Sequence, residues 1–180
     1  SNFLEKFFSE KMLGLLYTVG SLGNIIVFLY ISRILERIRN YRLMLYLIIL
    51  EIATLLGLAV LNNPYAIMVR FIIHHAVNPI LLFNLDVFLE RFSENSETGG
   101  IRGVFLTVMN ATFVLSPLAV GLLLGKNENF SLIYIISAGF MVPLFYLIFK
   151  NFRTLPHRPY KKIDIRATAA AFFTNKRLWY

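Results

Sequence analysis

Five long apolar runs follow one another along the chain, and short polar connections separate them. Each run has about the 20 residues that an α-helix needs to cross ~30 Å of hydrocarbon. The pattern predicts an all-α polytopic membrane protein with transmembrane helices at residues 12–31, 43–61, 65–89, 102–125 and 130–149. Before them, residues 1–11 form an amphipathic segment, and after them residues 150–180 form a basic tail.

The composition supports insertion into a membrane. Of the 180 residues, 57% are apolar and 16% are charged, whereas about a quarter of a soluble domain is charged. The net charge of +8 comes from Lys and Arg that lie mainly in the connections and the tail, without the interleaved aromatic residues that single-strand binders use. We therefore expect a lipid bilayer as partner and no nucleic acid. Cysteine is absent, which excludes disulfides and thiolate metal sites, and we expect no cofactor.

The connection Ile31–Arg42 sets the expected orientation. It carries one acid, Glu36, among four arginines: Arg33, Arg37, Arg39 and Arg42. Cytoplasmic loops carry an excess of Lys and Arg, and placing this connection inside puts most of the chain's 18 Lys and Arg residues on that side. We predict a multi-pass protein of the cytoplasmic (inner or plasma) membrane, with residues 1–11 outside and the tail in the cytoplasm. An external start without a signal peptide is expected if one more span precedes residue 1, so that the chain is a fragment.

Three local patterns resemble the major facilitator superfamily of secondary transporters. That family has a loop of the form G-x-x-x-D-R-x-G-R/K-x-R/K after its second helix, and residues 32–42 lie in register with it. Glu36 and Arg37 match the acid–Arg pair, and Arg42 matches a trailing basic residue, whereas both glycines are replaced. The family's fourth helix carries an Arg near its outer end, where this chain has Arg70, with His74 in the place of a Gly.

The third pattern is the G-x-x-x-G-P-x-x-x-G of the family's fifth helix. Thr112, Ser116, Pro117 and Gly121 fit its spacing, with small polar residues for two glycines. The resemblance covers nearly the whole chain and implies helices two to six of a six-helix half, with the remaining helices of the parent transporter as partners. It also implies secondary active transport of a small solute by alternating access, with or without coupling to protons, and no enzymatic activity.

The run at 65–89 is unusually polar for a membrane helix. An ionisable group at the bilayer centre costs ~2.5–3.5 kcal/mol on insertion scales, so such groups are candidates for function. We therefore select polar residues of this run, together with one from each of two other runs, as candidates for a substrate or proton pathway. They are Asn24, Arg70, His74, Asn78, Asn84 and Asn110. The resemblance implies that the face with Arg70 and His74 lines a water-filled cavity. The alternative is that Arg70 extends to the outer interface as an anchor.

Glu51 and His75 lie at similar expected depths in adjacent antiparallel runs. Such a pair could relay protons, since histidine titrates near neutral pH, or it could hold two helices together, and we favour the structural pair. His74 and His75 point about 100° apart on a helix, so we expect no metal site there. Pro79 removes the hydrogen bond to the carbonyl of His75, and this predicts a kink.

A charge network is expected at the cytoplasmic face, formed by Glu36, Arg37, Arg42, Asp86 and Glu90. In the family that the chain resembles, such a network helps to latch one conformation during alternating access. Cytoplasmic enrichment in basic residues accounts for the arginines without a latch, but it does not account for Glu36.

Two other function classes are alternatives. A membrane enzyme would need a motif such as H-E-x-x-H, and the sequence has none. A non-catalytic accessory or assembly subunit would fit a chain with five native spans, and an apolar segment before Ser1 would instead support the transporter. The sequence does not identify the solute, its direction or a coupling ion.

Overall fold

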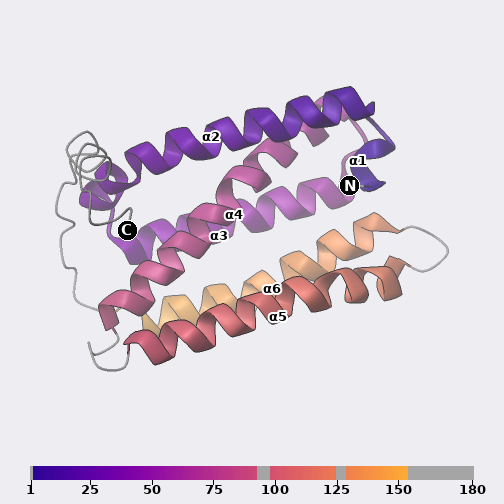
Figure 1. Ribbon diagram of the computed structural model, residues 1–180. Coiled ribbons are helices and arrows are strands. Elements are labelled where there is room, and N and C mark those ends of the chain that lie inside the picture. Colours follow the sequence, from indigo (N-terminus) through magenta and orange to yellow (C-terminus); the bar gives the residue numbers. More distant parts are fainter. Residues whose placement is uncertain (1, 93–97, 125–128, 154–180) are drawn as a thin grey trace, which may run out of the picture.

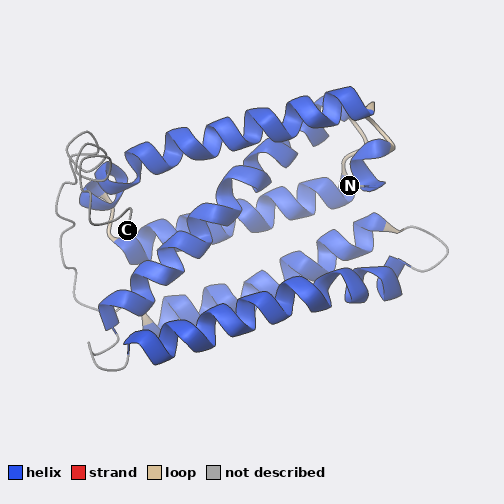
Figure 2. Cartoon of the chain, in the orientation of Figure 1, coloured by secondary structure: helices blue, strands red, loops and turns tan. Residues whose placement is uncertain are grey.

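Residues 2–92, 98–124 and 129–153 are described by the computed structural model, and every element in these ranges is a helix (Figures 1 and 2). The helices are α1 (Asn2–Glu5), α2 (Glu10–Arg37), α3 (Asn40–Val60), α4 (Pro64–Phe92), α5 (Thr98–Leu124) and α6 (Phe130–Asn151). The five from α2 to α6 are long and apolar enough to cross a membrane. The expected fold class, an all-α bundle with five membrane spans, is therefore confirmed.

The connection expected at Ile31–Arg42 is largely helical. Helix α2 continues to Arg37, and only Ile38 and Arg39 separate it from α3. The helix continues because Ile31 and Leu35 remain buried, at 8% and 1% exposure, so each further turn adds apolar contact. We call the end of the bundle that holds this turn the arginine-rich end.

Helix α4 begins where its sequence favours a start. Pro64 occupies the first helical position, which needs no backbone donor. The side-chain Oδ1 of Asn63 accepts hydrogen bonds from the backbone N–H groups of Tyr65, at 2.9 Å, and Ala66, at 3.3 Å. These bonds satisfy donors that a helix start otherwise leaves free.

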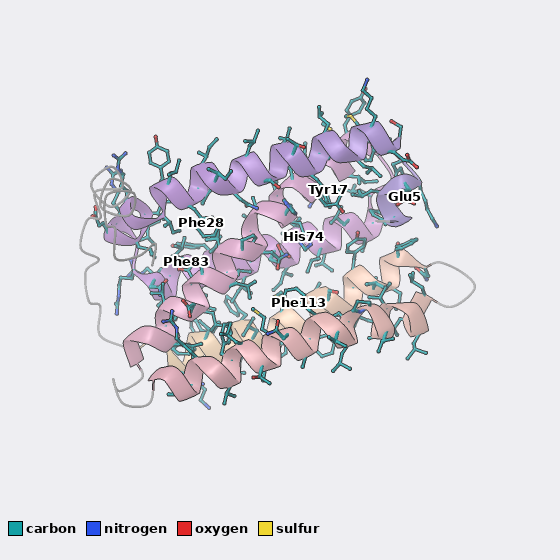
Figure 3. All side chains as sticks on the ribbon, in the orientation of Figure 1. Glu5, Tyr17, Phe28, His74, Phe83 and Phe113 are labelled. Atoms are coloured by element: carbon teal, nitrogen blue, oxygen red, sulfur yellow. The ribbon has the colours of Figure 1, made fainter. Side chains whose placement is uncertain are left out.

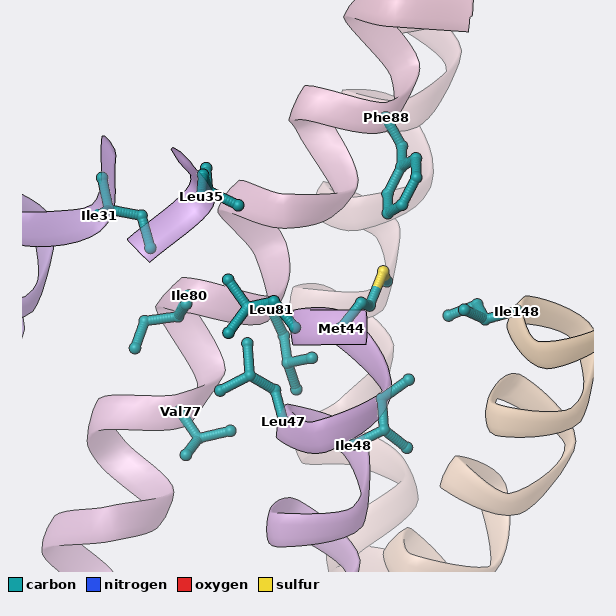
Figure 4. Close-up of a cluster of buried hydrophobic side chains, with 11 residues drawn as sticks. Ile31, Leu35, Met44, Leu47, Ile48, Val77, Ile80, Leu81, Phe88 and Ile148 are labelled. Atoms are coloured by element: carbon teal, nitrogen blue, oxygen red, sulfur yellow. The ribbon is translucent and has the colours of Figure 1, made fainter. Parts of the chain in front are cut away.

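Helix α3 is the centre of the packing. It packs most extensively against α6 and then against α4, and α2 packs against α4 on the other side. The larger buried cluster lies toward the arginine-rich end and joins four helices (Figure 4). Its members include Ile31, Leu35, Met44, Leu47, Ile48, Val77, Ile80, Leu81, Phe88 and Ile148.

A second cluster closes the opposite end of the bundle and includes the start of the chain. Phe3 and Leu4 of α1 are buried, and the Phe3 ring lies 5.6 Å from the ring of Phe130 and 5.1 Å from that of Tyr134. Glu5 remains exposed. The amphipathic pattern of this segment therefore corresponds to one side that packs against the ends of the helices and another that is exposed. Its expected external location stays a prediction.

Helix α5 contributes least to the interior. It makes sparse contacts with α4 and α6, and none of its described residues is buried. Phe113, labelled in Figure 3, is 63% exposed. The contacts that hold α5 in place within the described chain are therefore few.

Candidate functional site

A buried carboxylate meets an imidazole between α3 and α4. Glu51 of α3 is 1% exposed, and its Oε1 lies 2.5 Å from Nδ1 of His74. Asn78, one turn further along α4, donates from Nδ2 to the same Oε1 at 3.2 Å. Figure 3 shows His74 near the middle of the bundle's length. We refer to Glu51, His74 and Asn78 as the Glu51 cluster.

Helical spacing brings these groups together. His74 and Asn78 are four residues apart, so both lie on the side of α4 that faces α3. Glu51 lies on the buried face of α3 beside Ile48 and Thr54, which are 0% and 2% exposed. Among the residues that the structure describes, no group of three or more His, Asp or Glu side chains could hold a metal ion. The cluster itself places a carboxylate in hydrogen-bonding contact with an imidazole, and such a pair can share a proton.

The predicted pair of Glu51 with His75 is wrong, because the partner is His74. His75 lies on the other face of α4, where its ring centroid is 5.7 Å from that of Tyr17 and 6.0 Å from that of Phe71. A Cβ on Gly20 would lie 2.6 Å from Cδ2 of His75, so α2 approaches α4 closely here. Successive helical residues point about 100° apart. His74 therefore faces α3, whereas His75, the next residue, faces α2.

The backbone carbonyl of His75 has a donor from another helix. Pro79 lacks the N–H group that would bond this carbonyl inside α4. The Nδ2 atom of Asn24, on α2, donates to the carbonyl oxygen at 3.2 Å. Asn24 was expected to line a pathway, and in the structure it satisfies the carbonyl that the proline leaves free.

Arg70 lies along α3, one helical turn from His74. Its Nη1 donates to the carbonyl oxygen of Ala53 at 2.9 Å. The guanidinium occupies the space in which a side chain at Gly57 would lie. Arg70, His74 and Asn78 thus contact α3 from one face of α4.

Two other pathway candidates differ in their surroundings. Asn84 is fully buried on α4, and neither its Nδ2 nor its Oδ1 has a hydrogen-bond partner within the described ranges. Asn110 is exposed on α5. The structure brings neither into the Glu51 cluster, and the expectation that the candidates line a pathway stays a prediction.

Asp86 pairs with a residue that the sequence argument did not select. Arg102, on α5, donates from Nε to Oδ1 of Asp86 at 3.1 Å and from Nη2 to Oδ2 at 2.7 Å. The pair is bidentate and joins α4 to α5 at the arginine-rich end. Arg102 is the first residue of the apolar run expected at 102–125 and follows a polar connection. That position could have suggested it as a partner for an acid at the same end of the bundle.

The other members of the expected charge network lie at the same end. Glu36 and Arg37 line an open hollow at the end of α2, together with Tyr30 and Arg33. Arg42 is exposed in the first turns of α3. The side chain of Glu90 lies outside the described residues. A network of all five side chains therefore stays a prediction.

One protein-family model matches the chain over residues 3–180, and its description is Major Facilitator Superfamily. No curated protein and no solved structure matches the chain.

Proposed function

The chain belongs to the major facilitator superfamily, and from that membership we propose that it carries out secondary active transport of a small solute by alternating access, coupled to protons. The family match over residues 3–180 carries the proposal. Transporters of this class bind their substrate near the bilayer midplane and open to one side at a time. The five apolar helices make the chain an integral, multi-pass membrane protein in contact with lipid.

Ionisable side chains in the membrane interior support the proton coupling. Glu51, His74 and Arg70 all lie on long apolar helices, in contact with the α3–α4 interface. Since such groups are costly in a bilayer, they mark ion and proton pathways in membrane proteins. Arg70 and Asn110 are the residues that we propose for contact with the solute.

A gate formed by charges at the arginine-rich end is part of the proposal, with that end in the cytoplasm. Its members are Glu36, Arg37, Arg42, Asp86 and Glu90. The bond between Asp86 and Arg102 supports it, because this pair joins two helices that otherwise make few contacts. A charge pair of this kind can separate and re-form without unpacking an apolar interface.

Transport in proteoliposomes tests the proposal. The complete natural protein would be reconstituted, and labelled sugars, amino acids, organic anions and organic cations would be offered with an imposed proton gradient. We expect one class to accumulate against its own gradient and a protonophore to abolish the accumulation. Accumulation that the protonophore leaves intact would reject proton coupling alone. Correct insertion with no accumulation of any class would favour the accessory-subunit function.

Cysteine labelling tests the orientation separately. Because this chain has no cysteine, single cysteines at Asn2 and Lys161 would report their own sides of the membrane. We expect an impermeant reagent to reach the two positions from opposite faces. Labelling from the same face would contradict the odd number of spans.

A further inference from the structure

The Glu51 cluster places a buried acid in contact with a base that is less buried. Glu51 is 1% exposed, whereas the side chain of His74 is 30% exposed. The imidazole thus lies between the carboxylate and the more open side of α4. Since Glu51 has little surface of its own, His74 is the more accessible member of the pair.

Oε1 of Glu51 and Nδ1 of His74 lie within hydrogen-bonding distance, at 2.5 Å, so the imidazole tautomer with a hydrogen on Nδ1 can donate to the carboxylate. In one state the carboxylate accepts the Nδ1–H of a neutral imidazole, and the pair has a charge of −1. When a proton arrives, an N–H bond forms at Nε2, the imidazole becomes a cation, and the pair becomes neutral. Both states keep the same contact, so the site can gain or lose one proton without breaking it.

We infer that the Glu51–His74 pair is the site that binds and releases the coupled proton, with Asn78 as its positioning residue. This inference rests on the proposed function, because a coupled proton has meaning only in a transporter. Asn78 donates to Oε1 of Glu51 and lies 3.2 Å from Nδ1 of His74, so it holds the two groups in register.

The burial of the carboxylate charge supports proton uptake. Oε2 of Glu51 is buried and has no hydrogen-bond partner among the described residues. A buried charged oxygen without a donor is unfavourable in a membrane interior. The protonated pair has no net charge, so proton binding stabilises the closed contact between α3 and α4, and proton loss weakens it.

Within the described ranges, Arg70 is the cation that α4 places one turn from His74. On α4, Arg70 lies one turn away with its guanidinium on the carbonyl of Ala53, and His75 faces α2 and Tyr17. On α5 the described titratable side chain is Arg102, which is paired with Asp86. The middle of α6, residues 135–145, carries no titratable side chain. Among the described residues, Glu51 and Arg70 are therefore the charged side chains that α3 and α4 place beside His74.

Two variants test the site, and each has a matched control. Glu51→Gln keeps the size of the side chain and an acceptor for His74 but cannot titrate, and Glu10→Gln removes an exposed carboxylate at the start of α2. His74→Gln removes the nitrogen that receives the proton, and His75→Gln makes the same change on the other face of α4. Folding would be checked by membrane insertion and by the unfolding temperature.

Each variant is then assayed for proton-driven accumulation and for solute exchange, so that loss of proton coupling can be distinguished from loss of solute movement. We expect Glu51→Gln and His74→Gln to lose proton-driven accumulation but to keep solute exchange at equal concentrations, which moves no net proton. Glu10→Gln and His75→Gln should keep both the accumulation and its sensitivity to a protonophore. If Glu51→Gln does not insert, the accumulation measured for His74→Gln alone tests the inference, because this variant keeps the buried carboxylate.

The outcomes distinguish this inference from the proposed function. Full proton-driven accumulation by both Glu51→Gln and His74→Gln would overturn the inference and leave the transporter intact. A wild-type protein whose accumulation does not respond to a protonophore would overturn proton coupling itself. Loss of exchange together with accumulation in well-folded variants would assign the pair to solute binding and also contradict the inference.

Discussion

The side-chain amide of Asn24 donates to the carbonyl oxygen of His75 at 3.2 Å. This carbonyl lies four residues before Pro79, whose ring nitrogen has no hydrogen to offer. Helix α2 thereby supplies the donor that α4 lacks. Because the bonded turn also carries His74, the contact fixes the part of α4 from which the Glu51 cluster is built.

Asn24→Ala should destabilise the protein by ~0.6 kcal/mol, the average measured for hydrogen bonds between membrane helices, and by no more than ~1.7 kcal/mol, the largest value. Pro79→Ala returns a backbone donor to α4, so the cost of Asn24→Ala should shrink in that background. The free energies of unfolding of the four proteins form a double-mutant cycle. An equal cost in both backgrounds would show that Asn24 does not replace the missing donor.

Gly20→Ala should destabilise the contact between α2 and α4 by about 1–3 kcal/mol, the usual range for overpacking. The added Cβ would lie 2.6 Å from Cδ2 of His75, so the ring or the helix has to move. The unfolding temperature measures the effect. Gly23→Ala is the control on the same helix, because a Cβ there meets nothing within 4 Å, and equal effects of the two changes would contradict the close approach.

Gly57→Ala should displace the Arg70 guanidinium from the carbonyl of Ala53 while leaving the arginine in the sequence. The displaced group is the end of a flexible side chain, so stability should fall by no more than about 1 kcal/mol. If the position of Arg70 matters for transport, Gly57→Ala should reduce uptake in the same direction as Arg70→Ala, which we expect to abolish uptake without preventing insertion.

Uptake at normal expression levels measures both changes. Gly103→Ala on α5 is the control, because a Cβ there has nothing within 4 Å. Retained uptake in Arg70→Ala would remove Arg70 from the pathway. Normal uptake in Gly57→Ala alone would show that Arg70 works without its contact to Ala53.

Breaking the Asp86–Arg102 pair should change transport rate more than stability. The two side chains are 37% and 42% exposed, and ion pairs of such exposure contribute ~0–1 kcal/mol. Asp86→Asn and Arg102→Gln should each alter the rate of conformational exchange. The exchanged double variant Asp86→Arg, Arg102→Asp should restore the rate in part, and failure to restore it would argue against a gate at this pair.

The number and order of membrane helices could be predicted because length and apolar composition decide them. The end of α2 could not be predicted, because the arginines of its last turns suggested a polar connection although Ile31 and Leu35 remain buried. The free carbonyl at His75 followed from Pro79, but its donor depended on where α2 crosses α4. That crossing depends on side-chain packing between segments that are far apart in the sequence.

The Glu51 cluster shows the same limit more sharply. Neighbouring residues of a helix differ in depth by about 1.5 Å, yet they face directions about 100° apart. Sequence reasoning placed the partner of Glu51 on the right helix, but it chose His75 instead of His74. The Asp86–Arg102 pair was not predicted, because its formation depends on how α5 returns after the polar connection.

The sparse contacts of α5 also bear on how the chain is built during translation. Helix α5 leaves the ribosome before α6, yet α6 is the helix that has an extensive docking surface, on α3. Both before and after α6 is made, α5 is held in the bilayer mainly by its own apolar side chains, because its contacts with α4 and α6 are few. Polar substitutions on α5 would then act first on insertion, and their signature would be inverted topology or degradation of the nascent protein.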